Sequence, residues 1–366
     1  MKHYDHIFIV TNDLTNERRV KRIINVITDH HRSVLLIGRE LNGSVPLGDS
    51  VFDQHRVQCW FNGGPLFYFE FYLRATWLIL RSFSVDHITC NDLDTILIGR
   101  TLKRFLDFKL YLDCHEWFEE VPELNGKALK RGIWKWVAKR CIPVTDARYT
   151  VNALIGQQMG AVYNCDFQVV HNISPTVDNI DWSFRQERGP YRLVYLGVLN
   201  EARGLESLIK SMELLDTMVL DIIGDGDLSD QLRDQVVHSP ARDRITLHGS
   251  LTSDDFIPIL QKSHIGLNLL ESSSKSYYYS SANKLHDYIN HGLMVLTMDY
   301  PYYRLLAERC NSIKLIDTLK PNNIMTSIEA IIEVYDLTMI NQARLAFLAH
   351  HSWQNECVTI NQIYGT

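Results

Sequence analysis

One stretch late in the chain combines a cationic side chain with a helix start, an arrangement that can bind phosphate. Ser280 and Ser281 are typical N-cap residues before a run with helical spacing, and Lys284 falls in the first turn. The helix is expected to end at Gly292, and the apolar run 293–297 is expected to be a buried parallel strand. Unpaired backbone N–H groups at a helix start, together with an ammonium group, attract phosphate oxygens. The alternative interpretation is an ordinary α/β unit with a surface lysine.

Polar residues that can contact a ligand follow many of the predicted strands. In open α/β sheets, ligands bind beyond the carboxyl ends of the strands. One such residue alone means little, because loops are polar anyway. Here they recur in both halves of the chain, and this indicates a ligand-binding cleft between two domains. The residues are Thr11, Asn12, Asn91, Asp92, Cys114, His115, Glu116 and Asn152 in the first half and Gly197, Gly224, Asp225, Gly226 and Glu271 in the second.

Apolar runs alternate with segments of helical spacing along both halves, and this pattern predicts parallel sheets covered on both faces. Residues 1–172 form the first predicted domain and 191–348 the second. The polar, proline-containing stretch 173–190 is the predicted linker. A final helix, 349–366, is expected to return to the first domain. The predicted fold class is therefore α/β, with two Rossmann-like, doubly wound domains that face each other across a cleft.

The first half also holds a predicted strand at 57–61 and an aromatic-rich helix at 67–80, which is expected to pack in the core. Residues 127–140 hold six basic residues, two tryptophans and no acidic residue. Such a segment suits the surface of an anionic membrane; the alternative is the solvated back of a helix. The basic residues that recur four apart, on one predicted helical face, are Lys127, Arg131, Lys135 and Lys139; Ile133, Val137 and Cys141 line another.

Composition excludes several classes of protein. The formal net charge of −6 argues against a general nucleic-acid binder, and no apolar run approaches the ~20 residues of a membrane span. The N-terminal stretch turns polar after a few apolar residues, which is typical of a strand and not of a signal peptide. The seven cysteines are scattered, without a C-x-x-C pair, so we expect reduced thiols in the cytoplasm and no zinc site.

Three segments resemble GT-B glycosyltransferases of family 4. SSANKLHDYINHGLMVLTMDYPYYR, from Ser280 onward, resembles their donor-site segment, commonly S-x-x-K-L-x-E-Y-x-x-x-G-x-P-V. YLGVLNEARGLESLIKSM, from Tyr195 onward, resembles G-x-L-x-x-x-K-G-x-x-x-L-I-x-A, and LYLDCHEWFEEVPEL, from Leu110 onward, resembles Y-D-x-H-E-Y-F-x-E-V-P-E-L. With shorter matches, the resemblance covers nearly the whole chain in order. These shorter matches lie at 11–20, 91–95, 223–227 and 244–251.

The resemblance implies transfer of a sugar from a nucleotide-diphosphate sugar to an acceptor hydroxyl, with retention of the anomeric configuration. The donor would bind the second domain and a glycan or lipid-linked acceptor the first, in cell-surface polysaccharide or glycan biosynthesis. The leaving phosphate oxygen can take the acceptor's proton, so no separate strong base is required. No metal is implied, and no cofactor besides the nucleotide sugar as co-substrate.

On the donor side, the resemblance assigns charge stabilisation of the leaving diphosphate to Arg203, Lys284 and the helix that starts near Ser281. Arg203 offers a planar fork of donors for this role; the alternative is a solvated residue at a helix start. Asp287 would accept hydrogen bonds from ribose hydroxyls, or is a surface carboxylate that the helix dipole favours. The remaining donor-side residues implied are Gly197, Gly224, Asp225, His248, Gly249, Ser281 and Leu285.

Two positions depart from the family pattern. Val198 stands where relatives often have an arginine, and Tyr279 stands where they often have the first of two glutamates eight residues apart. These departures keep two alternatives open. One is a non-catalytic glycosyltransferase-like partner subunit, which would bind nucleotides weakly or not at all. The other is a GT-B sugar-nucleotide epimerase, which would bind the donor but need no acceptor.

On the acceptor side, His115 corresponds to a histidine that lies near the transferred sugar in the family. Such a histidine can hydrogen-bond a sugar hydroxyl or share a developing charge; the alternative is a solvated loop histidine. Glu116 is a candidate acceptor contact or part of a solvated acidic loop, and Asp92 a candidate ligand or a helix cap. The segment 11–20 lacks the Gly-Gly of many relatives. The acceptor-side residues implied are Asn12, Asn91, Asp92 and Glu116.

Overall fold

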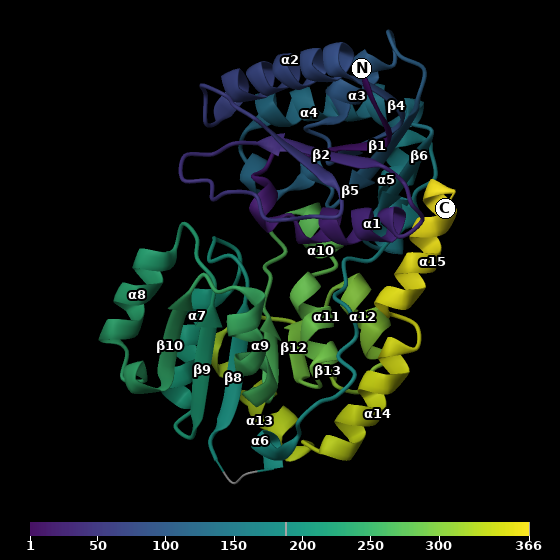
Figure 1. Cartoon of the computed structure of the whole chain (residues 1–366). Helices are drawn as coiled ribbons and strands as arrows, with labels where there is room; N and C mark the ends of the chain where they lie inside the picture. Colours follow the sequence, from purple (N-terminus) through teal and green to yellow (C-terminus); the bar gives the residue numbers. More distant parts are fainter. Residues whose placement is uncertain (187–188, 366) are drawn as a thin grey trace. The chain divides into compact units, whose positions relative to one another are not determined.

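The computed structural model describes residues 1–186 and 189–365, and these form two compact units (Figure 1). The first unit comprises Met1–Asn172 and the chain from Asn355 onward, and the second comprises Ile173–Gln354. Residues 187 and 188 of the predicted linker lie outside the described residues, as does residue 366 of the final predicted helix. Each unit has its own parallel sheet, as the alternation of apolar runs and helical segments predicts.

The first unit has a parallel sheet of seven described strands in the order β3-β2-β1-β4-β5-β6-β7. Its centre is largely apolar: Ile7 of β1 pairs with Leu35 of β2 and Ile88 of β4, and all three side chains are buried. Such strands need helices on both faces of the sheet. The strands are β1 (Lys2–Ile9), β2 (Val34–Arg39), β3 (Asp53–Val57), β4 (Phe83–Asn91), β5 (Lys109–Cys114), β6 (Ala147–Thr150) and β7 (Gln168–Val169).

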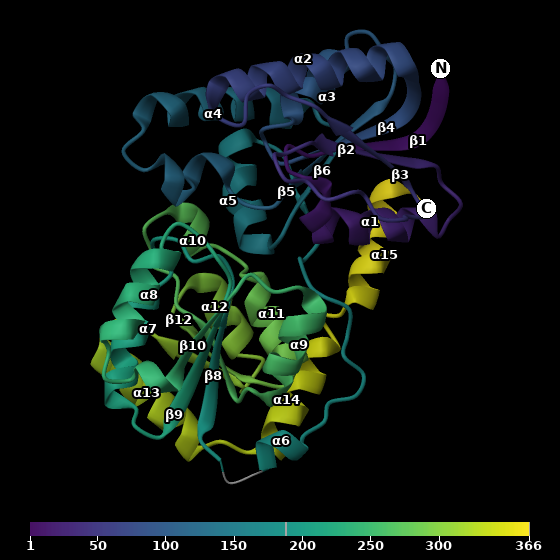
Figure 2. The same ribbon diagram turned by 60° about the vertical axis from the view of Figure 1, so that its left-hand side comes forward.

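In both views α2, α3 and α4 lie on one side of this sheet and α1 and α15 on the other (Figures 1 and 2). The last helix belongs to this unit, and its Tyr364 hydroxyl lies 2.9 Å from that of Tyr149 and 3.1 Å from Oγ1 of Thr89. The helices are α1 (Arg18–Thr28), α2 (Gly64–Ser82), α3 (Ile96–Leu102), α4 (Ala128–Cys141), α5 (Ala153–Tyr163) and α15 (Trp353–Tyr364), with 3-10 turns η1 (Leu14–Asn16), η2 (Phe118–Glu120), η3 (Pro122–Leu124) and η4 (Ile142–Val144).

One local prediction in this unit is wrong, and a second holds only in part. The strand predicted at 57–61 lies earlier, at Asp53–Val57, because it is an edge strand whose side chains are mostly solvated and so lack an apolar run. The aromatic helix α2 is a core helix on one face only. Phe71 and Ile79 are buried there, but Phe69 and Trp77 are exposed.

The second unit has a parallel sheet of six described strands in the order β10-β9-β8-β11-β12-β13. The strands are β8 (Tyr191–Leu196), β9 (Met218–Ile223), β10 (Ile245–Gly249), β11 (Ile265–Asn268), β12 (Met294–Met298) and β13 (Ile313–Ile316). The helices are α6 (Ser183–Gln186), α7 (Leu205–Ser211), α8 (Ser229–His238), α9 (Ser253–Lys262), α10 (Lys275–Tyr278), α11 (Asn283–Asn290), α12 (Pro301–Ala307), α13 (Pro321–Glu333) and α14 (Leu337–Leu348), with turns η5 (Met212–Leu214) and η6 (Arg242–Arg244).

Residues 173–186, at the start of the predicted linker, are held against the second unit. The amide of Asn290 donates to the carbonyl of Pro175 at 2.8 Å, and its oxygen accepts from the backbone N–H of Val177 at 3.0 Å. Arg185 is buried and donates to the carbonyls of Leu260 and Gly292. These contacts satisfy backbone groups that would otherwise be orphaned in the interior.

Candidate active site

In the second unit, the loops that follow β8, β9 and β10 are in direct backbone contact. The N–H of Gly197 donates to the carbonyl of Ile223 at 2.9 Å, and that of Gly224 to the carbonyl of Gly249 at 2.8 Å. Both Gly197 and Gly224 have φ +144°, a conformation that side chains rarely adopt. A Cβ on Gly224 would lie 1.9 Å from the carbonyl oxygen of Gly197. These glycines therefore allow backbone to approach backbone at the strand ends.

We expect Gly224→Ala to destabilise the protein by about 2–4 kcal/mol, because the new methyl group meets the carbonyl of Gly197 in a strained conformation. Gly249→Ala is the matched control. Gly249 also has a positive φ, +70°, but no atom lies within 4 Å of its would-be Cβ. The control should cost only about 1–2 kcal/mol. Urea unfolding of both variants measures the difference; equal losses would contradict the close-approach explanation.

Lys284 is the central side chain of this half of the site. It is only 7% exposed, and its Nζ lies 3.6 Å from the centroid of the Tyr195 ring. Among the described residues Nζ has no hydrogen-bond partner. A Cβ on Gly197 would lie 3.2 Å from it, so the ammonium group faces the loop after β8. Burial, and then the charge of Arg203, lower the pKa of Lys284 well below its ordinary value. A buried amine without a carboxylate keeps its proton only when an anion from outside the chain lies beside it, and otherwise becomes neutral.

Arg203 adds a second positive charge beside Lys284. Its guanidinium carbon lies 5.0 Å from the centroid of the Tyr277 ring, and its buried Nε has no hydrogen-bond partner among the described residues. Neither cation forms an ion pair with any carboxylate in the described part of the chain. The structure thus brings together Gly197, Arg203 and Lys284, as the sequence predicts.

The predicted serine cap of the donor helix is wrong. Helix α11 is Asn283–Asn290, and its N-cap is Ala282, which has no capping side chain. The serines are engaged elsewhere: Ser280 Oγ lies 2.9 Å from the hydroxyl of Tyr303, and Ser281 Oγ lies 3.3 Å from Nε2 of His286. The sequence pattern could not reveal that Ser280 contacts Tyr303 and Ser281 contacts His286.

The structure also fixes the side chains of the remaining donor-side candidates. Asp225 accepts hydrogen bonds from the N–H of Gly226 and the hydroxyl of Ser229, and these bonds lower its pKa. It therefore orders the start of α8. The Nε2 atom of His248 lies 2.7 Å from Oδ1 of Asp221, so this ring nitrogen is engaged within the unit.

Leu285 and Asp287 lie in α11 itself. Leu285 is fully buried, so its side chain belongs to the core. Asp287 is half-buried. Nucleotide contacts by these two residues, and by Asp225 and His248, stay predictions.

In the first unit, His115 lies after β5 between two carboxylates. Its Nε2 lies 3.0 Å from Oδ2 of Asp113, and its Nδ1 lies 3.1 Å from Oδ2 of Asp92. Asp92 also accepts from the backbone N–H of His115 at 2.8 Å. Arg19 of α1 holds Asp113 from the other side with two hydrogen bonds of 3.0 Å each. The four residues form one network, and three of them come from loops or strands at the carboxyl edge of the sheet.

Charge in this network is fixed by burial and by its neighbours. Burial lowers the pKa of His115, but the facing carboxylates of Asp92 and Asp113 outweigh burial and raise the pKa well above its ordinary value. Burial raises the pKa of Asp113, but Arg19 and His115 bring it down to about 2. His115 is therefore an imidazolium at neutral pH with both ring nitrogens facing carboxylates. It is a fixed positive charge and not an available base.

A pocket of about 210 Å³ opens beside this network and is rich in hydrogen-bond acceptors. Asn91 is 3% exposed and lines the pocket, and its Oδ1 has no hydrogen-bond partner among the described residues. Asp94, whose Oδ2 accepts from Thr11 at 2.5 Å, has its pKa raised to about 7 by burial and by Asp92. All four acceptor-side candidates line this pocket. Its residues include Thr11, Asn12, Glu17, Asn91, Asp92, Asp94, His115 and Glu116.

Sequence reasoning missed Arg19, Asp113, Glu17 and Asp94. Asp113 did carry a signal, because a carboxylate inside an apolar strand must find a partner when the strand is buried. The sequence could not say that this partner is Arg19, which precedes it by 94 residues.

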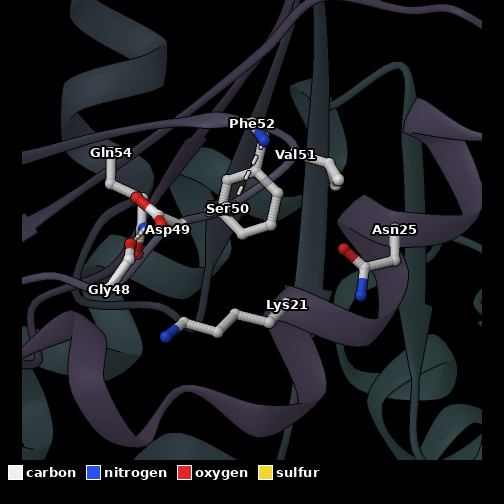
Figure 3. Close-up of a pocket in the computed structure, with 8 residues that line it drawn as sticks. All are labelled: Lys21, Asn25, Gly48, Asp49, Ser50, Val51, Phe52 and Gln54. Atoms are coloured by element: carbon white, nitrogen blue, oxygen red, sulfur yellow. Dashed lines mark hydrogen bonds between the residues drawn. The ribbon is translucent and has the colours of Figure 1, made fainter.

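A larger pocket of about 580 Å³ lies between α1 and the segment before β3 (Figure 3). Lys21 and Asn25 line it from α1, and residues 48–52 and Gln54 line it from the other side. Its apolar wall is Val51 and Phe52. Its charged groups, Lys21 and Asp49, form no cluster like that around His115.

Comparison with known proteins adds to this geometry. No family model and no curated protein matches the sequence. Solved structures do match. Sucrose-phosphate synthase from Thermosynechococcus elongatus is 14% identical and superposes with a TM-score of 0.80, over 100% of this chain and 98% of that chain. The chain has the GT-B fold. Its first unit is the N-terminal domain and its second unit the C-terminal domain of that fold.

Other GT-B structures match over the full length as well. HepE of Anabaena in complex with UDP-glucose is 13% identical, with a TM-score of 0.71 over 99% of this chain and 98% of that chain. The lipopolysaccharide outer core galactosyltransferase WaaB is 14% identical, with a TM-score of 0.66 over 99% of each chain. Identities this low show the fold alone, and function must be argued from the residues.

Proposed function

We propose that this GT-B protein is a glycosyltransferase that moves a sugar from a nucleotide-diphosphate sugar to an acceptor hydroxyl. The observation that carries the proposal is Lys284, a buried amine whose Nζ has no anion beside it among the described residues, next to Arg203 and the glycine loop after β8. A diphosphate supplies the missing negative charge. When the sugar–phosphate bond breaks, the two cations stabilise the charge on the leaving diphosphate. The UDP-glucose complex of HepE, which has the same fold, supports a nucleotide sugar as donor.

The acceptor side of the proposal rests on the N-terminal pocket. Its lining presents oxygen acceptors, including the unpartnered Oδ1 of Asn91, and these favour hydroxyl donors such as a sugar. The imidazolium of His115 is a fixed charge that holds Asp92 in place beside the pocket. We propose that Asn12, Asn91, Asp92 and Glu116 contact the acceptor. The leaving phosphate oxygen takes the acceptor's proton on the same face, so the anomeric configuration is retained.

The finer proposals follow from the same chemistry. We place the enzyme among the hexosyltransferases of family 4, acting without metal in cell-surface polysaccharide or glycan biosynthesis. The described cysteines are free thiols, which is consistent with the cytoplasm. The acceptor is a glycan or a lipid-linked sugar, and the basic segment 127–140 contacts an anionic membrane.

A thermal-shift screen against UDP-, GDP-, ADP- and CMP-linked sugars tests the donor site. A ligand at a hundred times its dissociation constant adds about 2.7 kcal/mol of stability. We expect a shift with one nucleotide, and its loss in both Arg203→Ala and Lys284→Ala. No shift with any nucleotide would overturn the proposal and favour the partner subunit that Val198 and Tyr279 suggest.

A second measurement separates transfer from epimerisation. Isomer formation from the donor in the absence of acceptor would indicate the epimerase. Transfer to an acceptor, with the anomeric configuration of the product read by NMR, tests retention.

A further inference from the structure

Helix α2 exposes a continuous apolar stripe. Leu66, Phe69, Leu73 and Trp77 are 58%, 63%, 48% and 60% exposed. Their spacing of three and four residues places them on one face, opposite the face that buries Phe71, Ala75 and Ile79. We call the four residues the α2 ridge. Contiguous exposed apolar surface of this kind marks an interaction site.

Helix α4 also exposes a stripe of apolar side chains. Leu129, Ile133 and Trp136 are 80%, 54% and 58% exposed and form the α4 ridge. They lie opposite the buried residues Val137, Ala138 and Cys141. The two helices are neighbours, because the ring of Tyr68 on α2 packs on that of Trp134 on α4, with centroids 5.5 Å apart. Both views show α2 and α4 side by side at the top of the first unit (Figures 1 and 2).

An arginine lies over an exposed tryptophan of each ridge. Arg81 lies over the ring of Trp77 at 5.0 Å and Arg140 over that of Trp136 at 6.0 Å. Residues 127–140 include no acid. The one acid of α2, Glu70, is buried and binds the backbone N–H groups of Trp60 and Phe61. The chain as a whole has a net charge of −6, but this surface is cationic and apolar. It is therefore complementary to a surface that carries negative charge next to hydrocarbon, as an anionic lipid bilayer does.

The basic face predicted from four-residue spacing is only partly available for such contact. Arg131 and Lys135 both form ion pairs with Glu120, which is 7% exposed. Ile133, predicted to lie with Val137 and Cys141, is exposed while those two are buried. The exposed cations of the segment are instead Lys127, Lys130, Lys139 and Arg140.

We infer that the α2 and α4 ridges lie in the surface of an anionic lipid bilayer. The apolar side chains enter the boundary between headgroups and acyl chains, and the lysines and arginines contact lipid phosphates. No helix in the described ranges is long and apolar enough to cross a membrane, so the contact is interfacial. The inference deepens the proposed membrane contact of residues 127–140: it adds α2 and assigns the apolar part of the contact to the ridges.

Flotation of the full chain with phosphatidylcholine vesicles, with and without phosphatidylglycerol, tests this inference in the absence of nucleotide. We expect binding to the anionic vesicles only, falling as salt rises. Leu73→Ser with Trp77→Ser should weaken binding by about tenfold or more. The matched control is Val237→Ser with Leu345→Ser, which removes side chains 59% and 56% exposed in the second unit and should bind as the parent does. Lys130→Glu with Lys139→Glu should weaken binding, whereas Lys314→Glu should not.

A separate measurement distinguishes insertion of the ridges into the bilayer from an electrostatic contact at its surface. Brominated lipids should quench tryptophan fluorescence, and Trp77→Phe should remove part of that quenching. Absence of binding to anionic vesicles, or unchanged binding by the ridge variant, would overturn the inference. Self-association without lipid that the ridge variant abolishes would do so as well, because the ridges would then bind a second copy. None of these results depends on the nucleotide screen, so the two proposals fail separately.

Discussion

Replacing Lys284 by methionine is expected to stabilise the free protein and to abolish its stabilisation by the nucleotide sugar. The side chain keeps its length but loses a charge that is 7% exposed and has no counter-ion among the described residues. Removing a buried amine that has no counter-ion and no hydrogen-bond partner among the described residues should raise the free energy of unfolding by about 1–2 kcal/mol, and loss of the contact with the Tyr195 ring offsets part of the gain. Gain of stability with loss of binding is the signature of a residue kept for its ligand.

Lys210→Met is the matched control, because Lys210 is an exposed lysine in the same domain. It should change neither stability nor nucleotide binding. Chemical unfolding and thermal shift with the nucleotide sugar measure both properties. A Lys284→Met protein that is less stable than the parent, or that keeps the ligand shift, would show that the ammonium group is structural.

The pH dependence gives an independent check on Lys284. Because burial lowers its pKa, the unfolded chain binds more protons than the folded chain between the folded pKa and the ordinary value of 10.5. Stability should therefore rise with pH through that window, and Lys284→Met should remove this rise. A bound diphosphate restores the ammonium form. In that window, calorimetry in buffers of different ionisation enthalpy should show proton uptake on binding.

Sequence patterns predicted the elements whose signals are local. The glycine loops follow apolar strands, and Lys284 lies in the first turn of α11, near the helix start that the sequence predicts. The role of Arg203 came from the family resemblance. The patterns were wrong where local chemistry is ambiguous. Edge strand β3 has no apolar run, and Ser280 and Ser281 precede a helix that they do not cap. Helix α2 is apolar on all sides, and periodicity does not distinguish a buried stripe from one that faces outward.

Contacts between residues far apart in the sequence could not be predicted, because no local sequence pattern records them. Arg19 lies in the first turn of α1 and Asp113 near the end of β5, and only the sheet order β1-β4-β5 brings them together. The role of His115 changes with them. From the sequence it is a candidate partner for a sugar hydroxyl, but in the structure Asp92 and Asp113 already face its two nitrogens. A motif identifies such a residue, whereas its protonation state follows from its neighbours.

Arg19→Met is expected to cost about 3–5 kcal/mol, because it leaves the fully buried Asp113 with only His115 as a charged partner. Arg32→Met is the matched control: it breaks the ion pair with Asp5, but Arg32 is 40% exposed, so the loss should stay under about 1 kcal/mol. Adding Asp113→Asn to Arg19→Met should recover much of the stability, since the unpaired carboxylate is gone. Urea unfolding of the three proteins measures these differences, and equal losses in the two single variants would contradict a buried pair.

The same network predicts how stability depends on pH. Asp113 has a folded pKa of about 2, so its contribution is present above the ordinary value of 3.8 and is lost as pH falls through about 2. His115 has a raised pKa, so its contribution is complete below 6.5 and is lost as pH rises through the folded pKa. The NMR signal of the His115 ring should therefore not titrate near pH 6.5. In Asp113→Asn, which removes one of the two facing charges, the pKa of His115 should fall. A His115 signal that titrates at its ordinary pKa in the parent would show that the imidazolium is not held between the two carboxylates.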